Sequence, residues 1–571
     1  MSRLVAIIKG RSVGRTVLNQ RRSPLLAPSN TFAGNTSKRR KNIIDKKITK
    51  LRFIDTIFLK ILLIYCIYLV DFLFVLFHND NRKKCQSEGN KMAVLENLEP
   101  KRVWYNFEEF CKVPHGTFDM DKISAFCYNW AKERGLEAYQ DDAKNVIIKK
   151  PGTAGYENSE PVIIQGHMDM VCEKVPGSAH DFKTDGLTLY VEDGYVRAKD
   201  TSLGGDNGIA IAMCMALLES DDIPHPPLEI LFTVDEEEGM GGAIAVDMSM
   251  FEGKKLINMD SEDEGLFTVG CAGGINYASH IPVSKETVSG TKLTVKLGGL
   301  KGGHSGHVIG QERGNANKMM GRLFNEIQAV TDISIVSVNG GSKMNVITPE
   351  CVSEFVVADV CKAKEVIAEM EKTWVSEFLG IEPDFFVEVK EEADVTVEAF
   401  DKCSTGRVIS YVELAPHGVM EYSRALANTV ETSLNLGVLE TKENEVLAKY
   451  QIRSSVETMK WEIAKRIDKL GKLVGAEEEI IAHYPAWKYE PVSPLRDVMV
   501  ETFEEMFDKK PEVFVMHAGL ECGFFAEKKP GIDIVSCGPD MWGIHSFNEK
   551  LDIASTARTW DFLLAILAKL K

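Results

Sequence analysis

Three short, mostly apolar stretches of this chain each run directly into a histidine or an aspartate. They cover residues 161–166, 228–234 and 255–259, and the residues that follow them are His167, Asp235 and Asp260. Their length and their content of Ile, Leu and Val predict buried strands. Because a charge buried at a strand end is costly unless it is paired or bound to a metal, these side chains must share a positive partner.

Apolar residues at helical spacing over residues 102–134 and 208–218 place helices around these strands. The chain is therefore expected to form an α/β sheet that carries its site at the strand ends. Strands alternate with polar helices over residues 276–482, and the last part of the chain then returns to the first pattern. We expect an α/β domain, residues 92–275 and 483–571, interrupted by an inserted α+β domain, residues 276–482.

Charge divides the chain into a basic start and an acidic body. Residues 1–91 carry 19 Lys and Arg against 5 Asp and Glu, about +14, whereas the remaining 480 carry 48 against 79, about −31. An acidic body argues against nucleic acid as a partner, because phosphate binding needs clustered basic residues. The 12 cysteines include no Cys-x-x-Cys pair, which predicts reduced thiols in a cytoplasmic protein.

The first 91 residues contain an apolar segment at 54–77 that is long enough to span a bilayer. Asp55, Lys60 and Asp71 interrupt it, and each charge opposes membrane insertion. Met92 begins a sequence typical of a cytosolic start. We expect residues 1–91 to be an extension from an upstream start codon, outside the fold and the chemistry. A membrane anchor through residues 54–77 and a targeting peptide are the alternatives.

Five short segments contain residues that could bind metal ions. They are Gly-His-Met-Asp at 166–169, Gly-Asp-Asn-Gly at 205–208, Asp-Glu-Glu-Glu-Gly at 235–239, Met-Asp-Ser-Glu at 259–262 and Gly-Ile-His-Ser at 543–546. A pair of divalent ions takes imidazole and carboxylate ligands and needs one carboxylate as a bridge. Asp206, at a helix start, suits the bridge; its alternative is a simple helix N-cap.

Two of these segments also contain acids for other roles. Asp169 lies two residues after His167 in an extended segment, so it can accept the N–H of that imidazole. In the acidic run at 235–238, one glutamate can bind metal while its neighbour acts as a general base. The alternative for this run is a solvated turn.

In this order, the five segments resemble the M20 metallopeptidases, and most closely the aminoacyl-histidine (Xaa-His) dipeptidases. Residues 98–104, 302–306 and 517–523 belong to the same resemblance, which runs from about Asn97 to the C-terminus. It implies a zinc-peptidase-type α/β catalytic domain, with a mixed sheet flanked by helices, and an inserted lid and dimerisation domain. It also implies a homodimeric metallodipeptidase that acts on small peptides.

The resemblance implies two divalent ions, zinc first, with cobalt or manganese as alternatives. Asp206 would bridge them. His167 and Asp260 would bind one ion, and Glu237 and His545 would bind the other.

Two acids would act beside these ligands. Asp169 would orient His167. Glu236 would take a proton from a metal-activated water and later pass it to the leaving amine.

Four further residues are expected to contact substrate: His304, Asn345, Arg453 and Gly519. His304 would steady the oxyanion, and Arg453 would hold the terminal carboxylate bidentately. Gly519 would allow a close backbone approach. A turn histidine and a strand-edge salt bridge are the alternatives for His304 and Arg453.

The expected activity is hydrolysis of dipeptides, Xaa-His included. An N-acyl amino acid deacylase on the same fold is one alternative. A non-catalytic peptide-binding protein is the other.

Overall fold

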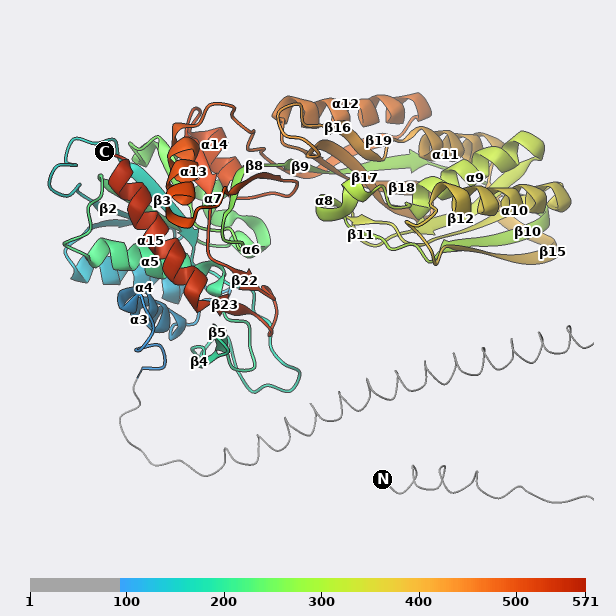
Figure 1. Cartoon of the computed structure of the whole chain (residues 1–571). Helices are drawn as coiled ribbons and strands as arrows, with labels where there is room; N and C mark the ends of the chain where they lie inside the picture. Colours follow the sequence, from blue (N-terminus) through green and yellow to red (C-terminus); the bar gives the residue numbers. More distant parts are fainter. Residues whose placement is uncertain (1–92) are drawn as a thin grey trace, which may run out of the picture. The chain divides into compact units, whose positions relative to one another are not determined.

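The structure is a computed structural model that describes residues 93–571. The apolar segment at 54–77 and the rest of residues 1–91 lie outside the described part. Within residues 93–571, no helix has the length and apolar character needed to cross a membrane. These residues build two large sheets, each with its own hydrophobic core (Figure 1).

The first sheet has eight strands in the order β1-β2-β6-β3-β7-β21-β8-β20. Its strands are β1 (Glu137–Gln140), β2 (Val146–Lys150), β3 (Val162–His167), β6 (Leu228–Thr233), β7 (Lys255–Asn258), β8 (Leu266–Cys271), β20 (Glu512–Met516) and β21 (Asp533–Ser536). Strands β6, β3, β7 and β21 are parallel neighbours, whereas β1 and β2 pair antiparallel at one edge. The mixed sheet confirms the predicted α/β fold.

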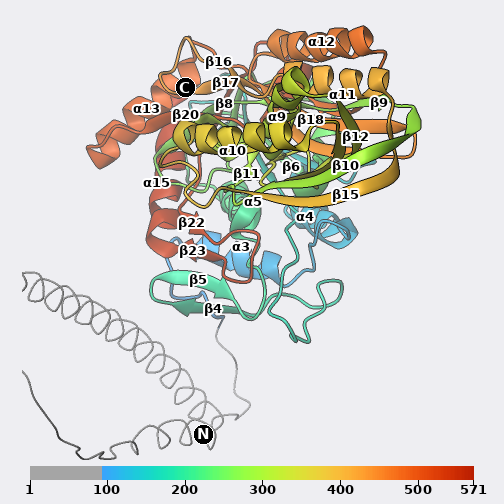
Figure 2. The same ribbon diagram turned by 90° about the vertical axis from the view of Figure 1, so that its right-hand side faces the viewer.

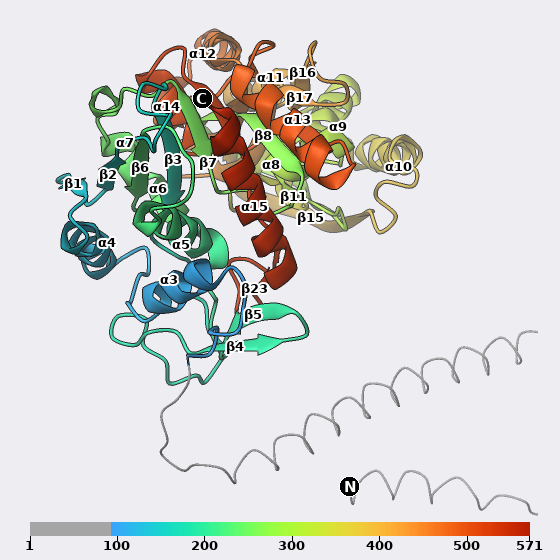
Figure 3. The same cartoon turned by 60° about the vertical axis from the view of Figure 1, so that its left-hand side comes forward.

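Helices cover both faces of this sheet, which explains why every residue of β3 and β6 is buried. One face carries α3 (Lys101–Cys111), α4 (Asp121–Glu133), α5 (Gly205–Glu219), α13 (Pro494–Phe507) and α15 (Ile553–Lys569). In Figure 3, α15 runs diagonally across the view. The shorter helices α7 (Gly241–Ala245) and α14 (Cys522–Lys528) pack into the core of the other face.

The helical pattern predicted over residues 102–134 is divided between two helices. The structure has two helices there, α3 and α4, joined by irregular chain. Pro114 lies in the joint, and a proline disfavours helical conformation in the residue before it. The apolar spacing on either side of this joint is helical, as predicted.

The second sheet has nine strands. They are β9 (Gly273–Pro282), β10 (Lys285–Gly298), β12 (Ile333–Gly340), β14 (Cys351–Val357), β15 (Phe386–Phe400), β16 (Gly418–Tyr422), β17 (Val430–Thr441), β18 (Glu445–Ser454) and β19 (Glu477–Tyr484). Four helices pack on it around one core (Figure 2): α9 (Ala316–Val330), α10 (Val360–Glu377), α11 (Lys402–Leu414) and α12 (Glu457–Val474).

The chain passes between the two sheets at two adjacent points. On the way out, Ala272 alone separates β8 from β9. On the way back, Trp487 pairs with Cys271 through two backbone hydrogen bonds of 2.8 and 3.0 Å. The predicted boundaries at 276 and 482 therefore fall inside β9 and β19 rather than between strands.

A small four-stranded sheet connects the end of the chain to its first part. Its order is β22 (Met541–Trp542), β23 (Lys550–Asp552), β5 (Tyr195–Ala198) and β4 (Leu189–Glu192). The turn between β22 and β23 carries His545, and β5 precedes the segment that carries Asp206. This pairing places both segments at the same side of the molecule.

Candidate metal centre and active site

Four of the predicted site residues lie at the carboxyl ends of three neighbouring parallel strands. His167 is the last residue of β3, and Asp260 follows β7 by two residues. Glu236 and Glu237 follow β6 and open the short helix α6 (Glu236–Gly239). Because parallel strands end at the same edge, the three strands bring these side chains together.

Asp206, at the start of α5, lies beside the carboxyl ends of these strands. Its backbone is not helical (φ −79°, ψ 103°), and its peptide bond to Asn207 is cis. The two oxygens of its carboxylate face different imidazoles. Oδ1 lies 3.0 Å from Nε2 of His167, and Oδ2 lies 3.2 Å from Nε2 of His545. A carboxylate that bridges two ions needs this arrangement.

The other two carboxylates each accompany one imidazole. Asp260 Oδ1 lies 3.3 Å from His167 Nε2, and Glu237 Oε2 lies 2.8 Å from His545 Nε2. Glu237 Oε1 is buried and has no hydrogen-bond partner. The structure thus brings all five predicted ligands together as two histidine and acid pairs on either side of Asp206.

The side chain of Asn207 fixes the start of α5 against the ends of β3 and β7. Asn207 donates a hydrogen bond of 2.7 Å from Nδ2 to the carbonyl oxygen of Met259. A Cβ atom at Gly166 would lie 2.4 Å from Asn207 Oδ1. Only glycine fits at position 166, which explains the glycine before His167 in the first motif.

The centre carries more negative charge than its protein groups neutralise. Burial and the charge of Asp206 raise the pKa of Asp260 to about 6, against the effect of His167. Hydrogen bonds to Asp206 and Glu237 raise the pKa of His545 to about 11. Without another cation, the site therefore retains protons near neutral pH.

The donor set fits divalent metal ions. Ligand atoms of His167, Asp206 and Glu237 all lie within 4.8 Å of one another. Two imidazoles and three carboxylates form a mixture that zinc, cobalt and manganese accept. The buried and unpartnered oxygen of Glu237 would gain a partner from such an ion.

Asp169 lies behind the ligands and is 1% exposed. Nδ1 of His167 lies 3.0 Å from the backbone carbonyl oxygen of Asp169 and 3.6 Å from its Oδ1. The two carboxylate oxygens of Asp169 also accept backbone N–H groups from Glu236, at 3.1 Å, and Glu237, at 3.4 Å. Burial alone would raise the pKa of Asp169, but the imidazole of His167, and then these two N–H groups, outweigh burial and lower the pKa. Asp169 thus fixes both the imidazole and the segment of the two glutamates.

The carboxylate of Glu236 forms no hydrogen bond with any other group of residues 93–571, and the residue is partly buried. Burial, and then the charges of Asp260 and Glu521, raise its pKa well above the usual range. A carboxyl group with a raised pKa can hold a proton between two transfer steps near neutral pH.

The predicted substrate residues lie around Arg453 and its neighbours. Arg453 is buried on β18, where Nη1 donates to the hydroxyl of Tyr484 at 2.9 Å and Nε has no partner. A Cβ atom at Gly519 would lie 2.7 Å from the Tyr484 ring, so this glycine has a packing role. Burial and the charge of Arg453 lower the pKa of His304 to about 4.

Asn345 supports the turn of His304 through its backbone, since its carbonyl oxygen accepts the N–H of Ser305 at 2.8 Å. His517, which had no predicted role, also belongs to this group. Its Nε2 lies 2.7 Å from Ser433 Oγ, and burial and Arg453 lower its pKa to about 3. His304, Arg453 and His517 together leave several buried nitrogen atoms without partners.

Two buried glutamates at the centre were not predicted from the sequence. Glu521 Oε2 accepts hydrogen bonds from Gln165, at 2.7 Å, and Thr233, at 2.8 Å, on β3 and β6. Burial raises its pKa to about 8. Glu549 lies four residues after His545. Glu521 is part of the motif at 517–523, but no sequence pattern distinguishes Glu549 from a surface acid.

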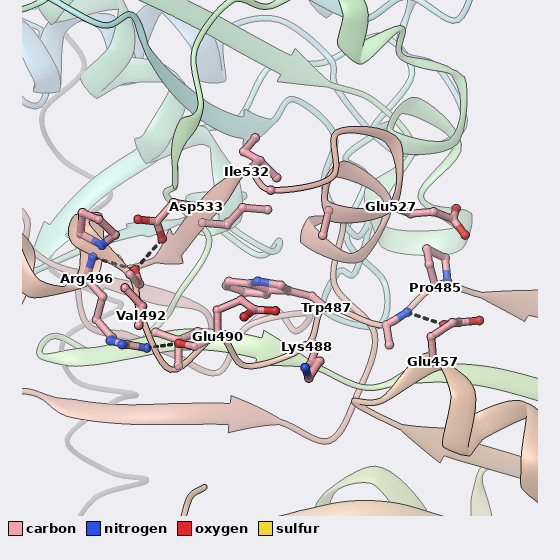
Figure 4. A pocket seen from close by; sticks show the side chains of 17 residues that line it. Glu457, Pro485, Trp487, Lys488, Glu490, Val492, Arg496, Glu527, Ile532 and Asp533 are labelled. Carbon is pink, nitrogen blue, oxygen red and sulfur yellow. Dashed lines mark hydrogen bonds between the residues drawn. The ribbon is translucent and has the colours of Figure 1, made fainter.

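A separate pocket of about 480 Å³ lies where the chain returns to the first sheet (Figure 4). Trp487 and Arg496 line it, and it contains none of the predicted site residues. Two of its charged side chains already have partners. Arg496 donates to the carbonyl oxygen of Glu490 at 2.8 Å, and Glu457 accepts the N–H of Ala486 at 3.1 Å.

Comparison with known proteins supports the assignment suggested by the motifs. The chain is 36% identical over 485 residues to the cytosol non-specific dipeptidase of Escherichia coli (strain K12), which covers 84% of this chain and 99% of that protein. The crystal structure of an aminoacylhistidine dipeptidase from Vibrio alginolyticus matches with a TM-score of 0.81 and 36% identity, over 84% of this chain and 98% of that one. The sequence model of Peptidase family M20/M25/M40 matches residues 163–569, which include all five candidate ligands. This chain therefore belongs to Peptidase family M20/M25/M40.

Proposed function

We propose that the protein is a metal-dependent dipeptidase that hydrolyses dipeptides, Xaa-His included. The observation that carries this proposal is the position of Asp206, whose two oxygens face the imidazoles of His167 and His545. The relatives named above are dipeptidases, and the chain aligns with almost their whole length.

We propose that five residues hold two divalent ions, zinc being the first candidate: His167, Asp206, Glu237, Asp260 and His545. Asp206 lies between the two histidine and acid pairs. When bound, such ions polarise the scissile carbonyl and lower the pKa of water. The protein supplies the fixed geometry, because each ligand comes from a strand end, a helix start or a tight turn.

Glu236 moves the proton in this proposal. Its carboxylate takes a proton from the attacking water and later gives it to the nitrogen of the leaving amine. The raised pKa of Glu236 suits a group that holds a proton between these steps. Asp169 positions Glu236 through the backbone hydrogen bond of 3.1 Å.

Arg453 and His304 would recognise the substrate. The unpartnered Nε of Arg453 gives a buried cationic donor for the terminal carboxylate of a dipeptide. His304 stays neutral at physiological pH because of burial and the nearby guanidinium. Its N–H can then stabilise the oxyanion without competing for the carboxylate. Asn345 and Gly519 would support these two residues.

The substrate assignment is tested by a pair of substrate classes. Purified protein supplied with zinc, manganese or cobalt should hydrolyse β-alanyl-histidine or glycyl-histidine faster than an N-acetyl amino acid. The reverse preference would indicate the deacylase. No turnover of any dipeptide with any of these metals would exclude the dipeptidase. If the N-acetyl amino acid is not hydrolysed either, peptide binding remains as the hypothesis.

We also propose a homodimer formed through the inserted domain and a cytoplasmic location. The edge strand β19 exposes the apolar side chains of Ile480 and Ile481, which a partner subunit would cover. The ten cysteines of residues 93–571 are unpaired, as expected in a reducing compartment. Sedimentation analysis of wild type and of Ile480→Glu tests the dimer. A monomeric wild type would contradict it.

A further inference from the structure

Glu549 is a buried carboxylate that binds the backbone just before Asp206. It is 4% exposed. Oε2 accepts the N–H groups of Leu203, at 2.7 Å, and Gly204, at 3.1 Å, while Oε1 accepts the N–H of Gly205 at 2.8 Å. Three consecutive N–H groups therefore converge on one side chain that lies more than 340 residues away in sequence.

The local backbone explains why these three N–H groups converge. Gly204 has a φ of 63°, in the left-handed region, and it precedes α5 as a cap without a side-chain hydrogen bond. Successive N–H groups around a left-handed residue form a concavity that binds anions. The start of a helix adds a partial positive charge. Glu549 thus serves as the missing cap of α5.

The position of Glu549 gives this cap a function at the metal centre. The next residue after the capped segment is Asp206, whose oxygens face both imidazoles. Glu549 also belongs to the turn that carries His545, and its N–H donates to the carbonyl oxygen of Ser546 at 3.1 Å. His545 itself has a φ of 57°, which few residues other than glycine adopt without support from their surroundings.

A buried carboxylate without a cationic partner lowers the stability of the fold, so stability alone does not explain Glu549. Among residues 93–571, no lysine, arginine or histidine forms an ion pair with Glu549. Burial and the charge of Asp206 raise its pKa to about 7, against the three N–H bonds. A neutral cap would avoid that cost.

We propose that Glu549 is a positioning residue that ties the Asp206 segment to the His545 turn, so that both ligands are correctly placed before metal binds. The inference rests on the proposed metal centre. It predicts that loss of the Glu549 carboxylate weakens metal binding while the fold persists. Partners that orient metal ligands typically change metal affinity about 10–100-fold when removed.

Glu549→Gln tests the proposal, because an amide can accept through one atom only and at least one of the three N–H groups loses its acceptor. Glu229→Gln is the matched control. Glu229 is also buried and accepts the N–H groups of Glu252 and Gly253, both at 2.9 Å, but at the opposite end of β6. Unlike Glu549, it also pairs with Lys149 at 2.8 Å. Glu549→Asp, which retains the charge on a shorter side chain, is a second variant in case the amide impairs folding.

The measurement is a cobalt titration of each metal-free full-length protein, followed by visible absorption, together with equilibrium dialysis against zinc. We expect wild type and Glu229→Gln to bind two ions with the same affinity. We expect Glu549→Gln to bind at least one ion about 10–100-fold more weakly and to show an altered cobalt spectrum. Wild-type affinity and spectrum in the folded Glu549 variants would overturn the inference, as would an equal loss in Glu229→Gln. A wild type that binds no metal would instead overturn the proposed function.

Discussion

Nε2 of His545 lies 2.8 Å from Oε2 of Glu237, although 308 residues separate the two in sequence. Between them the chain builds the whole second sheet and returns beside its point of departure, where Trp487 pairs with Cys271. The centre is complete only when the parallel strands and the β22–β23 turn have both formed. Metal binding and folding of the first sheet are therefore coupled.

Glu236→Ala should abolish turnover while metal binding persists. The side chain is not among the ligand atoms that converge on Asp206, whereas a positioned general base contributes about 10²–10⁴-fold to the rate. Steady-state kinetics and metal analysis of the same sample check this. Activity that survives the substitution would show that another group takes the proton.

Arg453→Lys should raise KM for dipeptides with a free terminal carboxylate. A lysine cannot bind a carboxylate bidentately, and the loss of one charged hydrogen bond costs about 1.5–3 kcal/mol, or about 10–100-fold. Dipeptide amides, which lack that carboxylate, should be hydrolysed by variant and wild type at similar efficiency. An equal loss for both substrates would indicate that Arg453 has a structural role through Tyr484.

Gly166→Ala should destabilise the protein by about 1–3 kcal/mol, because the new methyl group must displace Asn207 in a packed region. Gly406→Ala is the matched control. Gly406 lies in α11 with nothing near its would-be Cβ, so alanine there should stabilise the helix by about 0.5–1 kcal/mol. Urea denaturation of the two variants measures both effects. A Gly166 variant as stable as wild type would contradict the close approach.

His417 should make the protein less stable in mild acid. Its Nδ1 accepts the N–H of Leu436 at 3.4 Å, and burial and the charge of Lys318 lower its pKa from 6.5 to about 3. Below pH 6.5, His417 binds a proton in the unfolded chain but not in the folded protein. The free energy of unfolding therefore falls as the pH decreases from about 6.5 to about 3. At pH 5 the difference is about 2 kcal/mol.

His417→Gln retains an acceptor and cannot titrate, so its stability should change less than that of wild type between pH 7.5 and pH 5. Urea denaturation of both proteins at the two pH values gives the comparison. Parallel pH profiles for wild type and variant would mean that His417 does not contribute to acid sensitivity.

The sequence predicted the parts of the site that depend on local pattern. Strands β3, β6 and β7 each end within one residue of the end of an apolar run. Those ends and two glycine-rich turns indicated a metal site, and the resemblance to the M20 metallopeptidases implied which five residues are its ligands. The return of His545 was predicted because the last part of the chain repeats the α/β pattern of the first.

The missed features depend on contacts that no local pattern records. Glu549 binds backbone N–H groups, which every segment of a chain possesses, so its partner could not be identified from sequence. Glu521 contacts Gln165 and Thr233 only because β3, β6 and the segment before α14 meet in the fold. The predicted boundaries at 276 and 482 fall inside strands. Ala272 alone links β8 to β9, so the sequence contains no loop that would mark the passage between the two sheets.

The central claim is that a two-ion centre held by five residues hydrolyses dipeptides. The most direct test removes all metal from the purified protein and restores zinc or cobalt stepwise, with bound metal and glycyl-histidine hydrolysis measured in each sample. We predict no turnover without metal and full turnover at two ions per chain, with His545→Ala binding fewer ions. Full hydrolysis by metal-free protein, or no hydrolysis with two ions bound, would contradict the account.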